Sequence, residues 1–348
     1  MTPLTNDVPR IRQALIEDIP HLMHYVGREW KSGHIFSRDA DFFRYEYQCG
    51  QALNFIISEN SCGAVNGMLG FIPSSSAEDC DIWTTMWKVS RDTGNPVLGI
   101  QLLQYLKAQG HRTVMSLGIN QKTIGIYRYL GYATGTMNHH FLPNKAVRSF
   151  QIGKIPTDVA CLERPFMRSS LISLRSVAWG GIPADFLLAK ASHALPRKDI
   201  TYFERRYFKH PIYRYRVYGI YHDGQLATLL VARIVRVEAA SALRVVDIIG
   251  DESLLPWVTY ALHNTLENEG LEYLDLVSYG LDDGMLQQAC LSKLDLSDDQ
   301  IVIPNYFQPF TQKNIPIHFF VDGQISPNLR LFKADGDQDR PSLKEDTL

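Results

Sequence analysis

Residues 87–110, WKVSRDTGNPVLGIQLLQYLKAQG, have the residue types and spacing of a phosphate-binding turn. The segment starts as an apolar strand, breaks at the Gly-Asn-Pro turn of residues 94–96, and continues as a helix. A strand, a tight polar turn and a helix N-terminus together direct several backbone N–H groups at one point, where an anion can bind. The sequence therefore predicts a phosphate site at this turn.

A carboxylate stands at the beginning of the same strand, which we expect over residues 81–89. Asp81 has apolar neighbours, and an acid in such surroundings is costly unless it has a partner or a purpose. Strand alternation places Asp81, Trp83, Thr85 and Trp87 on one face, so that an acid lies beside indole rings that suit a sugar. Asp81 is therefore a candidate general base. The alternative is a strand-end aspartate in the turn-rich SSSAEDCD segment.

The elements that must position these residues alternate between strands and helices. The order is β-α-β-β-β-α-β-α-β, which predicts an α/β fold whose sheet mixes antiparallel and parallel strands. The expected elements are a strand and helix in 10–30, a hairpin in 53–73, strand 81–89, helix 96–109, strand 113–119, helix 121–131 and an extended piece in 132–142.

A weaker version of this order follows in the second half of the chain. It comprises a hairpin around His-Asp-Gly (222–224), strand 243–251, helix 253–269, strand 273–280 and a helix from about 283. We interpret the repeat as an internal duplication of two tandem domains, 1–145 and 171–328, with a connection over 146–170 and a tail over 329–348. The segment GDESLLPWV has no Gly-rich turn, so we expect the first half to bind the phosphate and the second to bind another substrate.

Bulk properties exclude several classes of protein. The chain has 348 residues, 45% of them hydrophobic and 21% charged, and a net charge of −2. This balance gives no footprint for nucleic acid or an anionic membrane, although the basic and aromatic RRYFKHPIYRYR (205–216) is a combination also seen in RNA binders. With no long apolar run and no signal peptide, we expect a cytoplasmic protein. The five scattered cysteines predict buried free thiols and no metal site.

The order of elements resembles the GNAT superfamily of CoA-dependent N-acyltransferases. In that family a central strand splays from its neighbour, the thioester arm lies in the gap, and the pyrophosphate sits on the following turn. The family pattern Gln/Arg-x-x-Gly-x-Gly/Ala reads RDTGNP at 91–96, where Pro96 replaces a small residue and removes one N–H donor. A second motif, Asn-x-x-Ala-x-x-x-Tyr-x-Lys-x-Gly-Phe, is matched in spacing by Asn120, Thr123, Tyr127, Tyr129, Gly131 and Tyr132, with Tyr129 departing from the usual lysine.

A narrower resemblance runs along most of the chain. It is carried by GHI (33–35), DIWTTMWKV (81–89), ERRYFKHPIYRYRVYGI (204–220), IPNYFQPF (303–310) and FKADGDQDRP (332–341). Together these look like the tandem-GNAT sugar N-acyltransferases of bacterial surface-polysaccharide and O-antigen biosynthesis, of the anthrose-pathway type. The resemblance implies an acyl-CoA donor, either acetyl-CoA or a longer acyl-CoA, and a dTDP- or UDP-linked aminosugar acceptor.

The resemblance also implies roles for individual residues in acyl transfer. A phenol with a pKa of about 10 can protonate a leaving thiolate, a role that falls to Tyr127. His34 is implied as an acid/base or hydrogen-bond donor. Apart from the resemblance, the place of Ser116 in the strand before the Tyr127 helix makes it a candidate to bind or orient the amine, beside Asp81 as base. A backbone N–H in 88–90 would serve as oxyanion donor. The residues expected to bind the cofactor are Lys88, Val89, Ser90, Arg91, Gly94, Asn95, Asn120 and Tyr127.

The acceptor is expected to contact the last part of the chain. Tyr306 and Phe307 offer rings for a base, while Lys333 and Arg340 offer cations for phosphates. The alternative for the tail is a solvated coil, and for the aromatic residues a core strand. The full set expected to bind the acceptor is Trp83, Trp87, Asn305, Tyr306, Lys333, Asp335, Asp337, Gln338 and Arg340.

Two other functions are compatible with the same patterns. One is a GNAT-type acyltransferase acting on a peptide, amino acid or polyamine. The other is a non-catalytic module that binds CoA, for which Pro96 in the phosphate turn is the argument. We expect a monomer or homodimer, with coenzyme A and a nucleotide-linked aminosugar as partners, and neither nucleic acid nor membrane.

Overall fold

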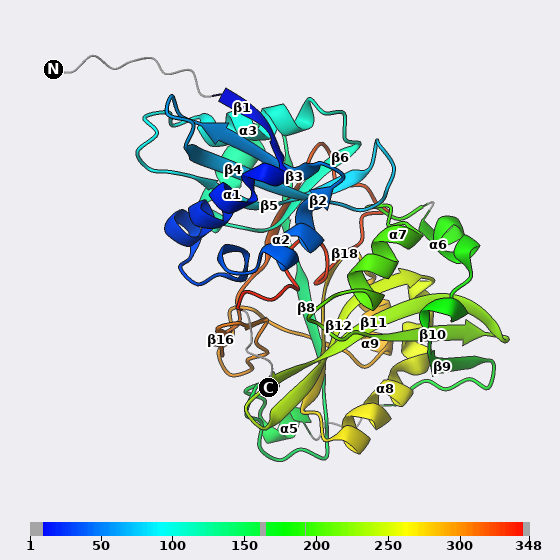
Figure 1. Ribbon diagram of the computed structural model, residues 1–348. Helices are drawn as coiled ribbons and strands as arrows, with labels where there is room; N and C mark the ends of the chain where they lie inside the picture. Colours follow the sequence, from blue (N-terminus) through cyan, green and yellow to red (C-terminus); the bar gives the residue numbers. More distant parts are fainter. Residues whose placement is uncertain (1–9, 161–164, 192, 344–348) are drawn as a thin grey trace.

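The computed structural model describes residues 10–160, 165–191 and 193–343. Two eight-stranded mixed sheets form the framework, with helices packed against their faces (Figure 1). The mixed α/β architecture with two sheets that the sequence predicts is therefore confirmed.

The first sheet is built mainly from the first half of the chain, and its only parallel pair is β5–β6. The order across the sheet is β1 (Arg10–Leu15), β3 (Ala52–Glu59), β4 (Val65–Pro73), β5 (Asp81–Val89), β6 (Thr113–Ile119), β17 (His318–Val321) and β7 (Ala133–Thr136), with β2 (Gln48–Cys49) paired to β3.

The second sheet repeats that order, and its only parallel pair is β12–β13. It runs β9 (Ile172–Ser176), β10 (Arg216–His222), β11 (Gln225–Val237), β12 (Ala240–Gly250), β13 (Tyr273–Tyr279), β8 (Asn138–Pro143) and β14 (Ser292–Lys293), with β18 (Leu331–Phe332) paired to β13. Strand for strand, the two sheets have the same connectivity, as expected for a duplicated unit.

Each sheet is completed by one strand from the other half of the chain. β8 leaves the first half and pairs with β13, while β17 returns from the second half and lies between β6 and β7. In both sheets the exchanged strand lies directly beside the parallel pair. The two halves are therefore tied together next to the strands that are expected to hold the ligand.

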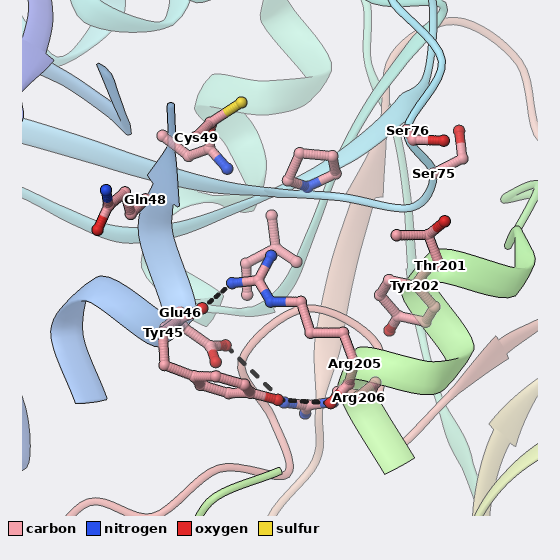
Figure 2. Close-up of a pocket in the computed structure, with 13 residues that line it drawn as sticks. Tyr45, Glu46, Gln48, Cys49, Ser75, Ser76, Thr201, Tyr202, Arg205 and Arg206 are labelled. Carbon is pink, nitrogen blue, oxygen red and sulfur yellow. Dashed lines mark hydrogen bonds and ion pairs between the residues drawn. The ribbon is translucent and has the colours of Figure 1, made fainter. Parts of the chain in front are cut away.

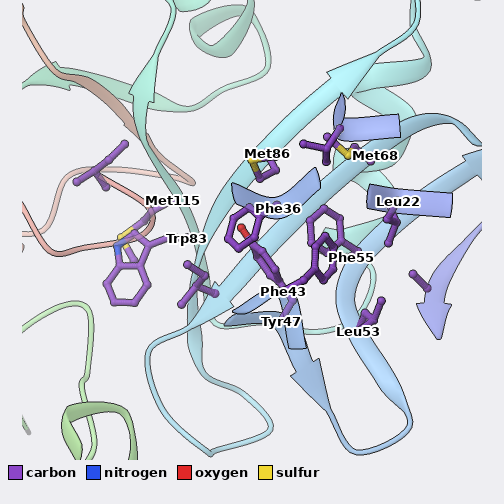
Figure 3. Close-up of a cluster of buried hydrophobic side chains, with 14 of the residues drawn as sticks. Leu22, Phe36, Phe43, Tyr47, Leu53, Phe55, Met68, Trp83, Met86 and Met115 are labelled. Atoms are coloured by element: carbon purple, nitrogen blue, oxygen red, sulfur yellow. The ribbon is translucent and has the colours of Figure 1, made fainter. Parts of the chain in front are cut away.

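Helices cover both faces of each sheet. α1 (Ile19–Tyr25) and α2 (Ala40–Tyr47) pack on one face of the first sheet over an aromatic core that includes Phe36, Phe43 and Phe55 (Figure 3). α3 (Leu98–Lys107) and α4 (Ile124–Tyr129) pack on the opposite face. The second sheet is covered by α6 (Ala184–Ala191) and α7 (Ile200–Phe203) on one face and by α8 (Leu255–Glu269) and α9 (Asp283–Gln288) on the other.

Smaller elements complete the described chain: α5 (Thr157–Ala160) and the ribbon β15 (Tyr306–Phe307) with β16 (Phe310–Thr311). Among the described residues, no helix combines the length and apolar character needed to cross a bilayer. Cys80 and Cys290 are buried as expected, but Cys49 and Cys62 are exposed because they lie at the ends of strands and turns. Cys161 lies outside the described residues.

Candidate active site

The parallel strands β5 and β6 separate after a short paired stretch. They are in register from Asp81 opposite Thr113 to Thr84 opposite Ser116, and beyond these residues the two strands are not paired with each other. The separation begins next to a bulge in β5, where Met86 has a φ of 45° and the register with β4 shifts. This is the splayed central pair that the resemblance to the GNAT superfamily implies.

A cavity of about 570 Å³, here called the strand cavity, lies along the separation. Its walls come from β5, β6, the first turn of α3 and the helix α4. Among the predicted residues, Trp87, Val89, Ser116, Asn120 and Tyr127 line it. It has the dimensions of an ordinary small-molecule site.

The alternation of backbone groups along β5 shows which N–H groups point toward this cavity. The N–H of Ser90 donates to the carbonyl of Asn66 at 2.9 Å, toward β4, so Ser90 cannot supply the oxyanion donor expected in 88–90. Successive residues of an antiparallel strand direct their N–H groups to opposite sides, so Val89 directs its own toward the gap. Val89, which lines the strand cavity, is therefore a backbone donor that the fold directs toward it.

The predicted phosphate turn lies at one end of the strand cavity. Pro96, Gly99 and Ile100 line the cavity there, at the start of α3. Gly94 has a φ of +65°, and a Cβ at this position would meet open space. The Asn95 side chain is used within the turn, since it accepts from the N–H of Val97 and donates to Gln101. Lys88, Arg91 and Gly94 are not among the lining residues.

Tyr127 is a buried phenol in the wall of the strand cavity. Its ring packs against Phe320 of β17, with a centroid separation of 4.5 Å, and lies 5.9 Å from the Trp87 ring. Burial raises the pKa of Tyr127, so the phenol keeps its proton at neutral pH. Ser116 Oγ donates to the Thr84 carbonyl at 3.3 Å, which fixes the Ser116 side chain at the point where the strands part.

Residues 331–343, here called the C-terminal segment, run between the two halves and are largely buried. The segment is anchored at both ends: the N–H of Ala334 donates to Val246 in β12, and the N–H of Ile35 donates to the carbonyl of Ser342. A solvated coil is therefore ruled out for these residues. Residues 344–348 of the predicted tail lie outside the described residues.

The middle of the C-terminal segment reaches the strand cavity. Asp337 and Gln338 line it, and the Gln338 amide nitrogen donates to the Leu117 carbonyl of β6 at 3.2 Å. Gly118 makes this approach possible, because a Cβ on that residue would collide with the Gln338 amide. The fold thus brings polar side chains from the end of the chain to the open edge of β6.

A second cavity of about 260 Å³, here called the tail cavity, lies on the other side of Asp337 and Gln338. The strand and tail cavities share Trp30, Asp337 and Gln338 as lining residues, so the two are adjacent. The structure brings together in the tail cavity the predicted residues His34, Asn305, Tyr306, Asp337, Gln338 and Arg340.

Asp337 is the carboxylate that faces both cavities. Its Oδ2 lies 3.0 Å from the Arg340 guanidinium, and Arg340 in turn donates to the hydroxyl of Tyr47 at 3.0 Å. Arg340 also stacks on Phe36 of the first core, 4.7 Å from the ring centroid. These contacts hold the carboxylate in a fixed position between the cavities.

His34 can donate a hydrogen bond but is a poor base. Its Nδ1 accepts from the N–H of Phe36 at 3.2 Å, which leaves the proton of the neutral ring on Nε2. Burial and the charge of Arg340 lower the pKa of His34 to about 3, so the imidazole is neutral at physiological pH. Of the two roles expected for His34, the geometry supports the donor.

The structure keeps Asp81 and Trp83 away from both cavities. Asp81 is fully buried and forms an ion pair with Arg112 at 2.5 Å. It also accepts a hydrogen bond from the N–H of Arg197 at 2.8 Å, so its carboxylate has a structural role. Trp83 is fully buried and contacts Tyr202 across the seam between the halves, with ring centroids 5.6 Å apart. The bulge at Met86 breaks the alternation that placed both residues on one face with Trp87.

Lys333 and Asp335 are also buried beneath the site and do not line it. Within the described chain, Lys333 Nζ has no hydrogen-bond partner and lies 4.7 Å from the centroid of the Tyr306 ring. Burial lowers the pKa of Lys333 to about 7. Asp335 lies 2.7 Å from Lys198, and burial raises the pKa of Asp335 to about 6. Neither is available for the phosphate or hydroxyl contacts expected of them.

The sequence reasoning missed two arginines of the tail cavity. Arg233 and Arg244 lie on β11 and β12, where they hold Asp339 and Asp275 in close ion pairs. A signal was present, because both arginines interrupt apolar strand sequences, and charged residues rarely occur there without a partner. The sequence does not predict which acidic residue pairs with each arginine.

A further cavity of about 250 Å³ lies at the seam between α2 and α7 (Figure 2). Its wall includes the ion pair of Glu46 and Arg206, 3.8 Å apart, and the Tyr45 hydroxyl bonded to the Arg205 carbonyl. None of the predicted site residues line it. In the part of the chain that the structure describes, no cluster of His, Cys, Asp or Glu could hold a metal ion.

Solved structures with the same fold have been described. A GCN5-related N-acetyltransferase from Anabaena variabilis matches 90% of this chain and 72% of its own, with a TM-score of 0.57 and 12% identity. A GCN5-related N-acetyltransferase from Kribbella flavida matches 92% of this chain and 72% of its own, with a TM-score of 0.53 and 12% identity. No known protein-family model matches the chain, and no curated protein matches its sequence. At these identities the likeness shows the fold, and the chain has the GNAT fold.

Proposed function

We propose that this protein is an acyl-CoA-dependent N-acyltransferase whose acceptor is the amino group of a dTDP- or UDP-linked aminodeoxysugar. The observation that carries the proposal is the open gap between β5 and β6, which joins a polar cavity at Asp337 and Gln338. An extended thioester arm fits the gap, and a polar acceptor fits the tail cavity. The two substrates would then meet at the residues that the cavities share.

The cofactor would be held by backbone more than by charge. Its diphosphate would lie at the start of α3, near Gly99 and Ile100, whose N–H groups belong to the first turn of the helix. The N–H of Val89 would bind the arm within the gap. Pro96 removes one donor from the turn, which leaves these amides as the main contacts.

Acyl transfer needs a group that accepts a proton and a group that donates one. In the proposed reaction the neutral amine attacks the thioester carbonyl carbon, and Asp337 takes the proton released from nitrogen. The carbon–sulfur bond then breaks, and Tyr127 gives its proton to the sulfur, which leaves as the free thiol. The Nε2–H of His34 would bind the acceptor in the tail cavity.

The test is a thiol-release assay across a panel of acyl-CoAs and nucleotide-linked aminosugars. We expect release that requires both substrates. Asp337→Asn should lower kcat by about 10²-fold or more, the usual contribution of a general base. Asp322→Asn is the matched control, because Asp322 is also a partly buried partner of a cation, Lys107, but lies outside both cavities.

Two results would contradict this proposal. If the purified chain had no affinity for any CoA thioester, the acyl-CoA assignment would fail. If the thioester were consumed equally well with peptides or simple amines, the acyltransferase would stand without the sugar acceptor. Should Asp337→Asn and Asp322→Asn reduce kcat to the same extent, Asp337 would be a structural residue.

A further inference from the structure

A fourth cavity, of about 390 Å³, opens beside the tail cavity and has an unusual lining. Four arginines surround it: Arg214, Arg216, Arg233 and Arg236. None of its lining residues is an aspartate or glutamate, whereas the tail cavity has both Asp337 and Asp339 in its wall. We call it the arginine cavity.

Two of the four arginines form ion pairs, and two do not within the described residues. Arg233 makes a two-pronged contact with Asp339, and Arg216 makes one with Glu269. Arg214 and Arg236 are exposed, and neither forms an ion pair within residues 10–160, 165–191 and 193–343. Arg236 does act on the charge of Glu269, but in the described chain the four arginines face only two acids, Glu269 and Asp339. The cavity therefore presents an excess of positive charge, which favours an anion.

Aromatic rings lie between the guanidinium groups. Tyr213, Tyr215 and Phe307 line the arginine cavity. Tyr213 stacks on His210 with an interplanar angle of 11° and has Arg233 4.1 Å from its ring centroid, so its ring is already in contact with two side chains. Arg244 lies 4.9 Å from the centroid of Phe307, which is the ring we assign to the base. A planar base binds well to a held aromatic face, and diphosphate binds to guanidinium groups.

The arginine cavity continues the two cavities already described. It shares Tyr213, Arg233, Phe307 and Gln308 with the tail cavity, which in turn shares three residues with the strand cavity. The order is thus strand cavity, tail cavity, arginine cavity. A ligand with its amino group at Asp337 would extend past Arg233 to reach the free arginines.

We infer that the arginine cavity binds the nucleoside diphosphate of the acceptor, with Arg214 and Arg236 on the phosphates and an aromatic face on the base. This inference rests on the proposed function and moves the nucleotide away from Lys333 and Arg340, which the fold uses for buried contacts. It also gives the basic, aromatic segment 205–216 a ligand, a nucleotide rather than RNA.

The experiment measures binding of dTDP and UDP to the full chain by calorimetry at low and high salt. One variant is Arg214→Ala/Arg236→Ala. The matched control is Arg168→Ala/Arg175→Ala, which removes two exposed arginines of the same half that lie outside the cavity and contact tyrosine rings. We expect the first variant to lose about tenfold or more in nucleotide affinity and much of its salt dependence, and the control to lose little. Arg214→Lys/Arg236→Lys should retain part of the affinity that the alanine variant loses.

Acetyl-CoA binding is measured on the same variants, so that the two proposals fail separately. Unchanged nucleotide affinity in Arg214→Ala/Arg236→Ala, or no nucleotide binding by the unaltered protein, would overturn the inference while acetyl-CoA binding still supports an acyltransferase. A loss of acetyl-CoA affinity in that variant would overturn it as well, because the arginines would then bind the cofactor. An absence of acetyl-CoA binding with intact dTDP or UDP binding would overturn the proposed function alone.

Discussion

The two parallel strand pairs of this molecule have the same topology, but the gap between the first pair is open and the gap between the second pair is filled. β5 and β6 separate around an open cavity, whereas β12 and β13, which are in register only from Leu243 to Val245, separate around the chain itself. β18 pairs with β13, and the next residues reach β12 through the Ala334 N–H. The C-terminal segment therefore occupies in the second sheet the place that is open in the first.

The turns before the two helices that follow the pairs carry different residues. The turn before α3 carries Arg91, Asp92 and Gly94, whereas the turn before α8 carries Asp251 and Glu252. Glu252 pairs with Arg330 at 2.8 Å. The first turn of each helix has no acid. One copy of the duplicated fold has the open strand cavity, and in the other the gap is filled by the C-terminal segment, which carries Asp337.

The largest effect on stability should come from the buried charged residues beside the filled gap between β12 and β13. Lys198 Nζ lies 2.8 Å from Asp247 and 2.7 Å from Asp335, all three buried. Lys198→Met would leave two carboxylates without a cation and should cost about 3–5 kcal/mol of unfolding free energy. Urea denaturation measures this, with the exposed Lys190→Met as control. Equal stability of both variants would mean that the second pair does not depend on these charges.

Ligand binding should distinguish the two pairs directly. Because only the first gap is open, calorimetry should give one acetyl-CoA per chain. At 100 times its dissociation constant, a ligand that binds only the folded state adds about 2.7 kcal/mol of stability, visible as a rise in Tm. Two acetyl-CoA molecules per chain would contradict this difference between the gaps, because the C-terminal segment would then have to leave the second gap.

A smaller effect is expected at Tyr127 in the open pair. Tyr127→Phe keeps the packing against Phe320 and removes only the proton donor, so kcat should fall about tenfold with KM nearly constant, a modest loss because a thiolate leaves readily. Tyr132→Phe serves as the control, because Tyr132 stacks on the same Phe320 but does not line the strand cavity. An unaltered kcat would remove the acid role of Tyr127.

The effect that depends on pH concerns Lys333 in the closed pair. Its pKa is lowered from 10.5 to about 7 by burial, so the unfolded chain holds more protons than the folded one between those values. Stability should therefore rise with pH above 7, by up to about 1.4 kcal/mol per pH unit from this group. Lys333→Met should flatten the rise between pH 7 and 9 and be more stable at pH 7. A slope unchanged in the variant would assign the pH dependence to other groups.

Much of the local structure and part of the site could be predicted from the sequence. The strand, turn and helix of residues 81–109 and the helix that carries Tyr127 follow from periodicity and turn residues, and the structure has them. The sequence also pointed to His34, Tyr306, Asp337 and Gln338, which line one cavity. It misplaced Trp83 because strand alternation assumes an unbroken strand, and the bulge at Met86 breaks it.

The sequence by itself determined which segments become strands and helices, because these depend on neighbours a few residues apart. Only the tertiary structure decided the contacts between distant segments: the exchange of β8 and β17, the pairing of Asp81 with Arg112, and the burial of Lys333 beneath Tyr306. It also decided that one gap stays open and the other is filled. The physical reason is that both gaps have the same local pattern, and the residues that fill the second one lie more than fifty positions beyond it along the chain.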